Sequence, residues 1–136
     1  MNYNYITALI YIHRMEEKNN LSSEELSQLV VMGMLEKKAS NVVVMDLRKV
    51  GNAVADFFVI ASGSSDTQVE SIAKSVDEEV FKKNKTNPWH REGMDGREWV
   101  LLDYVDVVAH VFKKETREFY DLENMWGDAK ITRIDS

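Results

Sequence analysis

A run of small and acidic residues between two apolar patterns is the part of this sequence best suited to hold a phosphate. Residues 62–66 read Ser-Gly-Ser-Ser-Asp. They follow an apolar stretch that predicts a strand and precede a pattern that predicts a helix. Free backbone N–H groups point outward at such a turn and can bind an anion. The turn from Ser62 to Asp66 is therefore where nucleotide chemistry has to be considered.

Nucleotide transfer also requires carboxylates that face one Mg²⁺ ion. Nucleotidyltransferases carry them as Asp-x-Asp or Asp-x-Glu on a strand shortly after the glycine and serine, because alternate residues of a strand share a face. Here Asp66, Glu70 and the acids at 77–79 fall on a predicted helix, and Asp103 and Asp106 stand three apart across a predicted turn. We therefore predict no catalytic residue and no metal site, and we do not expect an enzyme.

A nucleotide-binding or nucleotidyltransferase-like enzyme that uses the Ser62–Asp66 turn is kept as the alternative function. Only that function requires saturable binding of a nucleoside triphosphate with Mg²⁺, so a titration distinguishes it from a binding module. The sequence contains no glycine-rich Walker or Rossmann pattern, and no cofactor is predicted.

The histidines and the absence of cysteine narrow the chemistry further. His13, His90 and His110 are scattered and show no helical spacing with one another. His110 lies in an otherwise apolar strand pattern, which favours a core histidine over a catalytic base. With no cysteine, the chain has no disulfide, thiol nucleophile or thiolate metal site.

The length of the chain limits the number of domains, and its net charge limits the kind of partner it can bind. The chain has 136 residues, which predicts one domain. Its net charge is −6, from 17 basic and 23 acidic residues. This balance argues against broad contact with a phosphate backbone, so no DNA partner is expected. It is compatible with a basic protein partner.

The first twenty residues differ from the rest and are predicted to be an N-terminal extension, 1–20. The apolar run from Tyr5 to Ile12 is far shorter than the roughly 20 residues that span a bilayer. No basic residue precedes this run and no small-residue cleavage site follows it, so we expect no signal peptide, no membrane partner and a cytoplasmic protein. Met15 is a plausible alternative start of translation.

The stretch from Trp99 to Phe112 predicts a β-hairpin around which the chain is organised. Two short apolar runs, 99–103 and 107–112, flank a segment with two acids where the chain can turn back. Trp99 and Tyr104 are large enough to be either core residues or anchors for a partner. Tyr104 falls in the turn, where we expect burial to be difficult and the fold to tolerate its replacement by alanine.

The remaining elements complete an α/β (mixed α+β) single domain over 21–127, a mixed sheet with flanking helices. Ser22 and Glu25 form a capping box that predicts a helix to about residue 38. Ser65 and Gln68 suggest a second box, for a helix that ends near Asn84. The other predicted elements are strands at 42–47 and 57–61 (the latter central), a short edge strand at 88–91, a helical pattern over 113–126 and a loose tail over 128–136.

Three segments of this domain resemble, in order, the signatures of the ribosomal silencing factor (Iojap) family. The resemblance covers about 22–127, with Val105 where the family usually has glycine and Ala109 where it has a larger aliphatic residue. The matching positions are Asp56–Ser65, Gln68–Val69 and Ile72–Ala73; Glu92–Gly93, Trp99–Tyr104, Asp106–Val108 and His110–Val111; and Arg117, Phe119–Tyr120, Leu122–Glu123 and Trp126.

The resemblance implies a fold similar to nucleotidyltransferases without their catalytic acids, and a function in translation. Family members bind the large ribosomal subunit through its universal protein fourteen, block subunit joining and lower translation when nutrients are short. They often form homodimers when isolated. The family's contact surface falls on the hairpin and the loop before it. The resemblance therefore implies Trp99, Leu101, Asp103 and Tyr104 as partner-binding residues.

Overall fold

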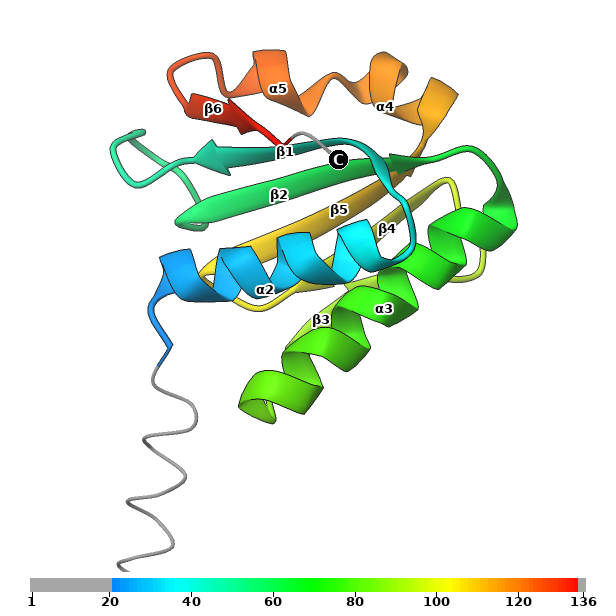
Figure 1. Cartoon of the computed structure of the whole chain (residues 1–136). Coiled ribbons are helices and arrows are strands. Elements are labelled where there is room, and N and C mark those ends of the chain that lie inside the picture. The colour runs from blue at the N-terminus through cyan, green and yellow to red at the C-terminus, as the bar shows by residue number, and fades with distance from the viewer. Residues whose placement is uncertain (1–20, 135–136) are drawn as a thin grey trace, which may run out of the picture.

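A six-stranded mixed sheet forms the centre of the computed structural model, which describes residues 21–134 (Figure 1). The predicted extension at 1–20 lies outside the described residues. The strand order is β3-β4-β5-β2-β1-β6, in which only β2 and β5 are parallel. The strands are β1 Ser40–Asp46, β2 Phe57–Gly63, β3 His90–Glu92, β4 Trp99–Asp103, β5 Val107–Lys113 and β6 Lys130–Arg133.

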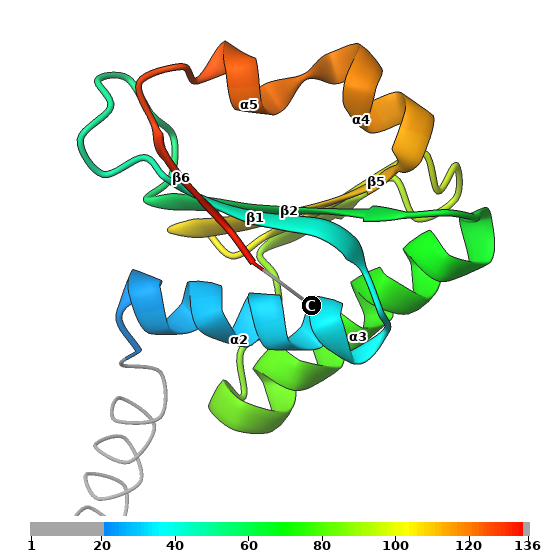
Figure 2. The same cartoon turned by 45° about the horizontal axis from the view of Figure 1, so that its top comes forward.

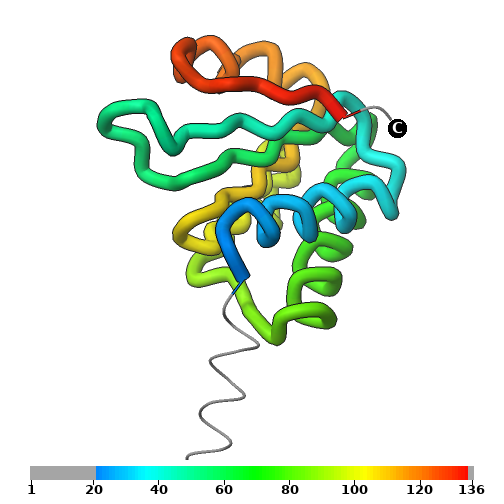
Figure 3. The backbone as a smooth tube through the Cα atoms, turned by 60° about the vertical axis from the view of Figure 1, so that its left-hand side comes forward, coloured from blue at the N-terminus to red at the C-terminus, as the bar shows by residue number. Residues whose placement is uncertain are grey.

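Helices cover the two faces of the sheet unequally. The long helices α2, Ser23–Glu36, and α3, Asp66–Asn84, pack on one face, and the short helices α4, Lys114–Tyr120, and α5, Leu122–Met125, lie over the other (Figure 2). The loop that joins β1 to β2 extends beyond the sheet (Figure 3). No helix within residues 21–134 is both long enough and apolar enough to cross a membrane. The predicted mixed α+β fold is confirmed.

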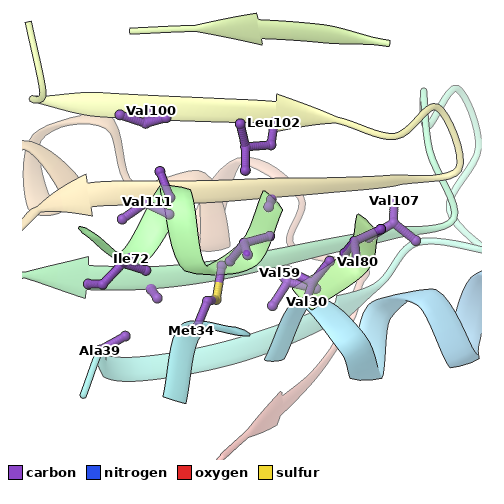
Figure 4. Packing of buried hydrophobic residues seen from close by; sticks show 14 of the residues in the cluster. Val30, Met34, Ala39, Val59, Ile72, Val80, Val100, Leu102, Val107 and Val111 are labelled. Carbon is purple, nitrogen blue, oxygen red and sulfur yellow. The ribbon is translucent and has the colours of Figure 1, made fainter. Parts of the chain in front are cut away.

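The larger core lies between the sheet and the two long helices. Strand β2 is buried along its whole length, as a central strand requires, and the apolar face predicted for α3 packs against it. Figure 4 shows this packing. Side chains at its centre include Val30, Met34, Val59, Ile72, Val80, Val100, Leu102, Val107 and Val111.

Helices α2 and α3 approach each other closely at Gly33. A Cβ atom on Gly33 would lie 2.7 Å from the Cα atom of Val76, which is inside any real contact distance. The Ser75 hydroxyl also donates a 2.6 Å hydrogen bond to the Gly33 carbonyl in a buried position. The crossing therefore depends on the missing side chain.

Both predicted helix starts are present, but only the first is a reciprocal capping box. Ser22 Oγ accepts from the Glu25 N–H at 3.1 Å, and the Ser22 N–H donates to Glu25 Oε1 at 3.2 Å. Ser65 Oγ accepts from the Gln68 N–H at 3.1 Å. Gln68 Oε1, however, accepts from the Ser64 N–H, and Gln68 Nε2 donates to the carbonyls of Lys37 and Lys38 just after α2. The prediction of a reciprocal box at Ser65 is therefore wrong.

A buried arginine fastens the α4–α5 layer to the ends of two strands. Arg117 is 8% exposed. Its Nη1 donates to the Asn41 carbonyl at 2.6 Å and to Ser62 Oγ at 2.9 Å, and its Nη2 lies 3.3 Å from Glu123 Oε2. A guanidinium supplies enough donors in a rigid fork to serve all three partners.

The predictions for the C-terminal region need correction. The pattern over 113–126 is two helices, because Asp121 adopts the left-handed conformation (φ 49°, ψ 53°) that aspartate tolerates better than most residues. The loose tail predicted over 128–136 is wrong for residues 130–133, which pair antiparallel with β1 as β6. Backbone pairing forms this strand, and its side chains are all exposed, so the apolar pattern carried no sign of it. The edge strand predicted at 88–91 starts two residues later.

Replacing Ser22 by alanine removes the side-chain acceptor at the start of α2. We expect the free energy of unfolding to fall by about 1 kcal/mol, the usual cost of losing an N-cap. Denaturant titration of the purified protein measures this loss. Ser23→Ala is the matched control, because the Ser23 side chain makes no hydrogen bond within residues 21–134. Equal stability of the two variants would contradict the role of the cap.

Candidate protein-interaction surface

Strand β4 sends the predicted contact residues to two different faces of the sheet. Trp99, Leu101 and Asp103 alternate with buried residues and are half-exposed. They lie on the face that carries α4 and α5. Val100, Leu102 and Tyr104 belong to the core beneath the long helices. The strand repeat of two thus brings three of the four predicted residues together and separates the fourth.

Tyr104 is a core residue, and the expectation that a turn position would keep it from being buried is wrong. Only 7% of its surface is exposed. Burial raises the pKa of its phenol, and its hydroxyl has no hydrogen-bond partner among the described residues. The structure therefore gives Tyr104 the role of an apolar support beneath the hairpin turn.

The hairpin turn itself is tight and held from one side by Asp103. The Asp103 carboxylate accepts from the Val105 N–H at 2.7 Å, and the Asp106 N–H donates to the Tyr104 carbonyl at 3.0 Å. These bonds close a three-residue turn centred on Val105, whose φ is 76°. A β-branched residue is strained at positive φ, whereas glycine is not.

Trp99 is fixed by contacts from two neighbouring elements. Its indole stacks on the Phe112 ring with centroids 4.8 Å apart, and the Tyr120 ring of α4 lies 4.8 Å away on a tilted axis. The indole Nε1–H donates to Nδ1 of His110 at 3.0 Å. Half-buried, the indole can support the fold and still present part of its surface to a partner.

Two aromatic residues that the sequence analysis did not select extend this surface. Phe119 is 81% exposed and Tyr120 is 45% exposed, with ring centroids 5.1 Å apart. The sequence placed them in the helical pattern over 113–126, and its apolar spacing gives no sign of the break at Asp121 that follows them. We define the aromatic surface as Trp99, Leu101, Asp103, Phe119 and Tyr120.

Ionic contacts hold α4 beside the start of β4. Lys113 Nζ lies 2.8 Å from Asp66 and 3.4 Å from Glu98, and Thr116 Oγ1 donates to Glu98 at 2.6 Å. The Thr116 hydrogen bond, followed by Lys113, holds the pKa of Glu98 below its usual value, and Lys113 does the same for the pKa of Asp66. These contacts are exposed, so they position α4 more than they stabilise it.

Acidic side chains lie around the aromatic surface on the same face. Glu92 of β3 is paired with Leu101, and His90 is paired with Asp103. Because paired residues in a sheet share a face, Glu92 adds a second carboxylate beside Asp103. Asp106 is exposed at the end of the turn. The surface thus combines apolar rings with negative charge.

The Ser62–Asp66 turn uses much of its hydrogen-bonding capacity internally. The Ser64 N–H donates to Gln68 Oε1 at 2.7 Å, Ser62 Oγ accepts from Arg117, and the Asp66 carboxylate pairs with Lys113. Within residues 21–134, no three histidine or acidic side chains are grouped as metal ligands would be. The contacts of the turn with Gln68, Arg117 and Lys113 show that it helps to hold α3 and α4 in place.

Comparison with known proteins gives consistent matches over nearly the whole domain. The family described as "Ribosomal silencing factor during starvation" matches residues 20–136. The protein named "Ribosomal silencing factor RsfS" from Halalkalibacterium halodurans is 38% identical over 115 residues, which are 85% of this chain and 97% of that protein.

A more distant relative and a solved structure agree with this match. The mouse protein named "Mitochondrial assembly of ribosomal large subunit protein 1" is 34% identical over 74 residues, 52% of this chain and 32% of that protein. A crystal structure of a protein from Chromobacterium violaceum superposes with a TM-score of 0.74 at 29% sequence identity, covering 85% of this chain and 95% of that one.

Replacing Tyr104 by alanine would open a cavity in the core. We expect the free energy of unfolding to fall by about 3 kcal/mol or more. Tyr104→Phe keeps the ring and removes only a hydroxyl without a partner, so its stability should equal or exceed that of the wild type. Denaturant titrations of the two variants test this placement, and a fully stable Tyr104→Ala protein would contradict it.

Replacing Val105 by glycine should relieve the strain at the turn. We expect the free energy of unfolding to rise by about 1 kcal/mol, since the left-handed region costs a β-branched residue roughly that much. Val54→Gly is the control: Val54 is 76% exposed and is not among the residues with positive φ, so glycine should destabilise there. Thermal unfolding of both variants measures the difference, and a shift of the same sign in both would refute the argument.

Proposed function

Because the chain belongs to the ribosomal silencing factor family, we propose that it represses translation by binding the large ribosomal subunit and blocking its union with the small subunit. The repression would act under nutrient limitation, in the cytoplasm. The observation that carries this proposal is the family match over residues 20–136. The names of the bacterial and mouse relatives, which refer to ribosomal silencing and to assembly of the large subunit, support it.

The proposed mechanism is steric exclusion, without a chemical step. A protein that occupies the face of the large subunit where the small subunit docks prevents joining by its volume alone. Such a function needs no cofactor and no catalytic residue. The contacts of the Ser62–Asp66 turn with Gln68 and Arg117 give the turn a role in the fold, which supports this mechanism over the alternative of a nucleotide-binding enzyme.

We propose the aromatic surface as the contact with protein fourteen of the large subunit. Trp99 and Leu101 would supply buried apolar area, and Phe119 and Tyr120 would extend it across α4. Aromatic side chains are the usual anchors of protein interfaces. Tyr104 would contribute indirectly, by supporting the turn from the core side of the sheet.

Charge favours a basic partner at this surface. Asp103 and Glu92 lie on the same face as Leu101, and the whole chain carries a net charge of −6. Complementary charge speeds association and orients the partner, and it does so more strongly at low salt. The same negative charge is unfavourable for DNA or an anionic membrane. In the absence of the subunit, the family resemblance supports a homodimer.

Reversing the charge at Asp103 should abolish co-sedimentation with the large subunit and the block to subunit joining. Lysine would face a basic partner and would also lose the acceptor for the Val105 N–H. Asp103→Asn separates these effects, because its amide oxygen can keep the hydrogen bond while the charge is lost. We expect intermediate binding from Asp103→Asn, with the largest deficit at low salt.

Glu78→Lys is the control for total charge. Glu78 is exposed on α3, on the other side of the sheet, and the substitution changes net charge by the same amount. We expect this variant to bind as the wild type does. Circular dichroism of each variant checks the fold. Undiminished co-sedimentation of Asp103→Lys would exclude this surface, and a wild type that ignores the large subunit would overturn the proposed function.

A further inference from the structure

His110 makes the hydrogen bond that sets the direction of the Trp99 indole. In the β4–β5 register His110 is opposite Leu101, and Phe112 is opposite Trp99, so His110 is a diagonal neighbour of the indole on the same face. The indole Nε1–H donates to His110 Nδ1 at 3.0 Å. The histidine is 3% exposed, whereas Trp99 reaches the surface.

The hydrogen bond fixes the protonation and tautomer of the imidazole. Because Nδ1 accepts, the ring proton must lie on Nε2. Burial lowers the pKa of His110 to about 3, so the ring is neutral near pH 7 and the acceptor is always available. Nε2 is buried and has no partner within residues 21–134.

The unpartnered Nε2 shows that packing alone does not account for a histidine here. A buried donor without an acceptor lowers stability, and an apolar ring of the same size would avoid that cost. The surroundings suit such a ring: Phe58 lies edge-on with centroids 4.6 Å apart, and Phe112 is nearly parallel at 6.2 Å. What an apolar ring cannot supply is the acceptor for Trp99.

Ring contacts hold the plane of the Trp99 indole, but they do not determine which edge of the ring faces the sheet. The stack on Phe112 and the tilted contact with Tyr120 are apolar. Both are compatible with an indole flipped by about 180° that keeps the same ring plane. The hydrogen bond to His110 distinguishes the two orientations, because only one directs Nε1 into the sheet. The other edge of the indole is then the one that is presented outward.

We propose that His110 is a positioning residue for partner binding, which holds the Trp99 indole in the orientation that the partner contacts. This inference rests on the proposed function of the aromatic surface. An anchor that is already oriented loses less conformational freedom on binding, and affinity rises accordingly. His110 itself would touch no partner, because it is buried among the rings of Phe58, Trp99 and Phe112.

Two substitutions at His110 separate positioning from stability. His110→Phe keeps an aromatic ring, removes the acceptor and removes the unpartnered donor. We expect binding to the large subunit to weaken about fivefold, as for the loss of one hydrogen bond, while the thermal midpoint stays equal or rises. His110→Asn places Oδ1 where Nδ1 stood, so binding should be retained although the smaller side chain lowers the midpoint. If His110 were merely structural, the variant with the lower thermal midpoint would also be the variant that binds the large subunit more weakly.

Trp99→Phe tests whether His110 affects binding through the Trp99 N–H. It keeps a ring without the N–H, so adding His110→Phe to it should not weaken binding any further. In the free protein, the indole N–H resonance that disappears in Trp99→Phe should shift in His110→Phe and stay close to its wild-type position in His110→Asn.

The outcomes distinguish this inference from the proposed function. An unchanged Trp99 resonance in His110→Phe, or undiminished binding by that variant, would overturn the positioning role. A shifted resonance in a protein whose wild type does not bind the large subunit would support the His110–Trp99 coupling and overturn the proposed function.

Discussion

The strict alternation of side chains along β4 is the constraint on which the candidate surface depends. A strand paired on both sides cannot rotate its residues, so Val100, Leu102 and Tyr104 must enter the core if Trp99, Leu101 and Asp103 are to face outward. The long helices cover one face of β4, while the short α4 reaches only as far as the Trp99 ring on the other. The five residues of β4 and the residue after it thus contribute alternately to the core and to the candidate surface.

Local signals were sufficient to predict most of the fold. The Ser22–Glu25 box, the uncharged run of β2 and the two apolar halves of the hairpin each depend on neighbouring residues, and each is present. Strand β6 depends on distant backbone pairing with β1, and its exposed side chains leave no pattern to read. The break between α4 and α5 turns on the backbone of one residue, Asp121, which the apolar spacing around it does not report.

The sequence placed Trp99, Leu101 and Asp103 on a strand of the candidate surface, but it did not predict the burial of Tyr104 or the exposure of Phe119 and Tyr120. Treating Tyr104 as a turn residue hid the fact that it continues the alternation of β4 into the core. Phe119 and Tyr120 were placed only in a helical apolar pattern, which does not identify them as exposed. In the structure they form the last two residues of the seven-residue helix α4 and are exposed.

The close crossing of α2 and α3 at Gly33 has a mechanical consequence. No side chain separates the two backbones at Gly33, and the Ser75 hydroxyl is hydrogen-bonded across the crossing. Sliding one helix along the other would break this hydrogen bond and the close backbone contact. A force along the axis of α2 would be shared with α3 at this crossing. The helix pair therefore acts as one stiff unit on the face of the sheet that carries the larger core.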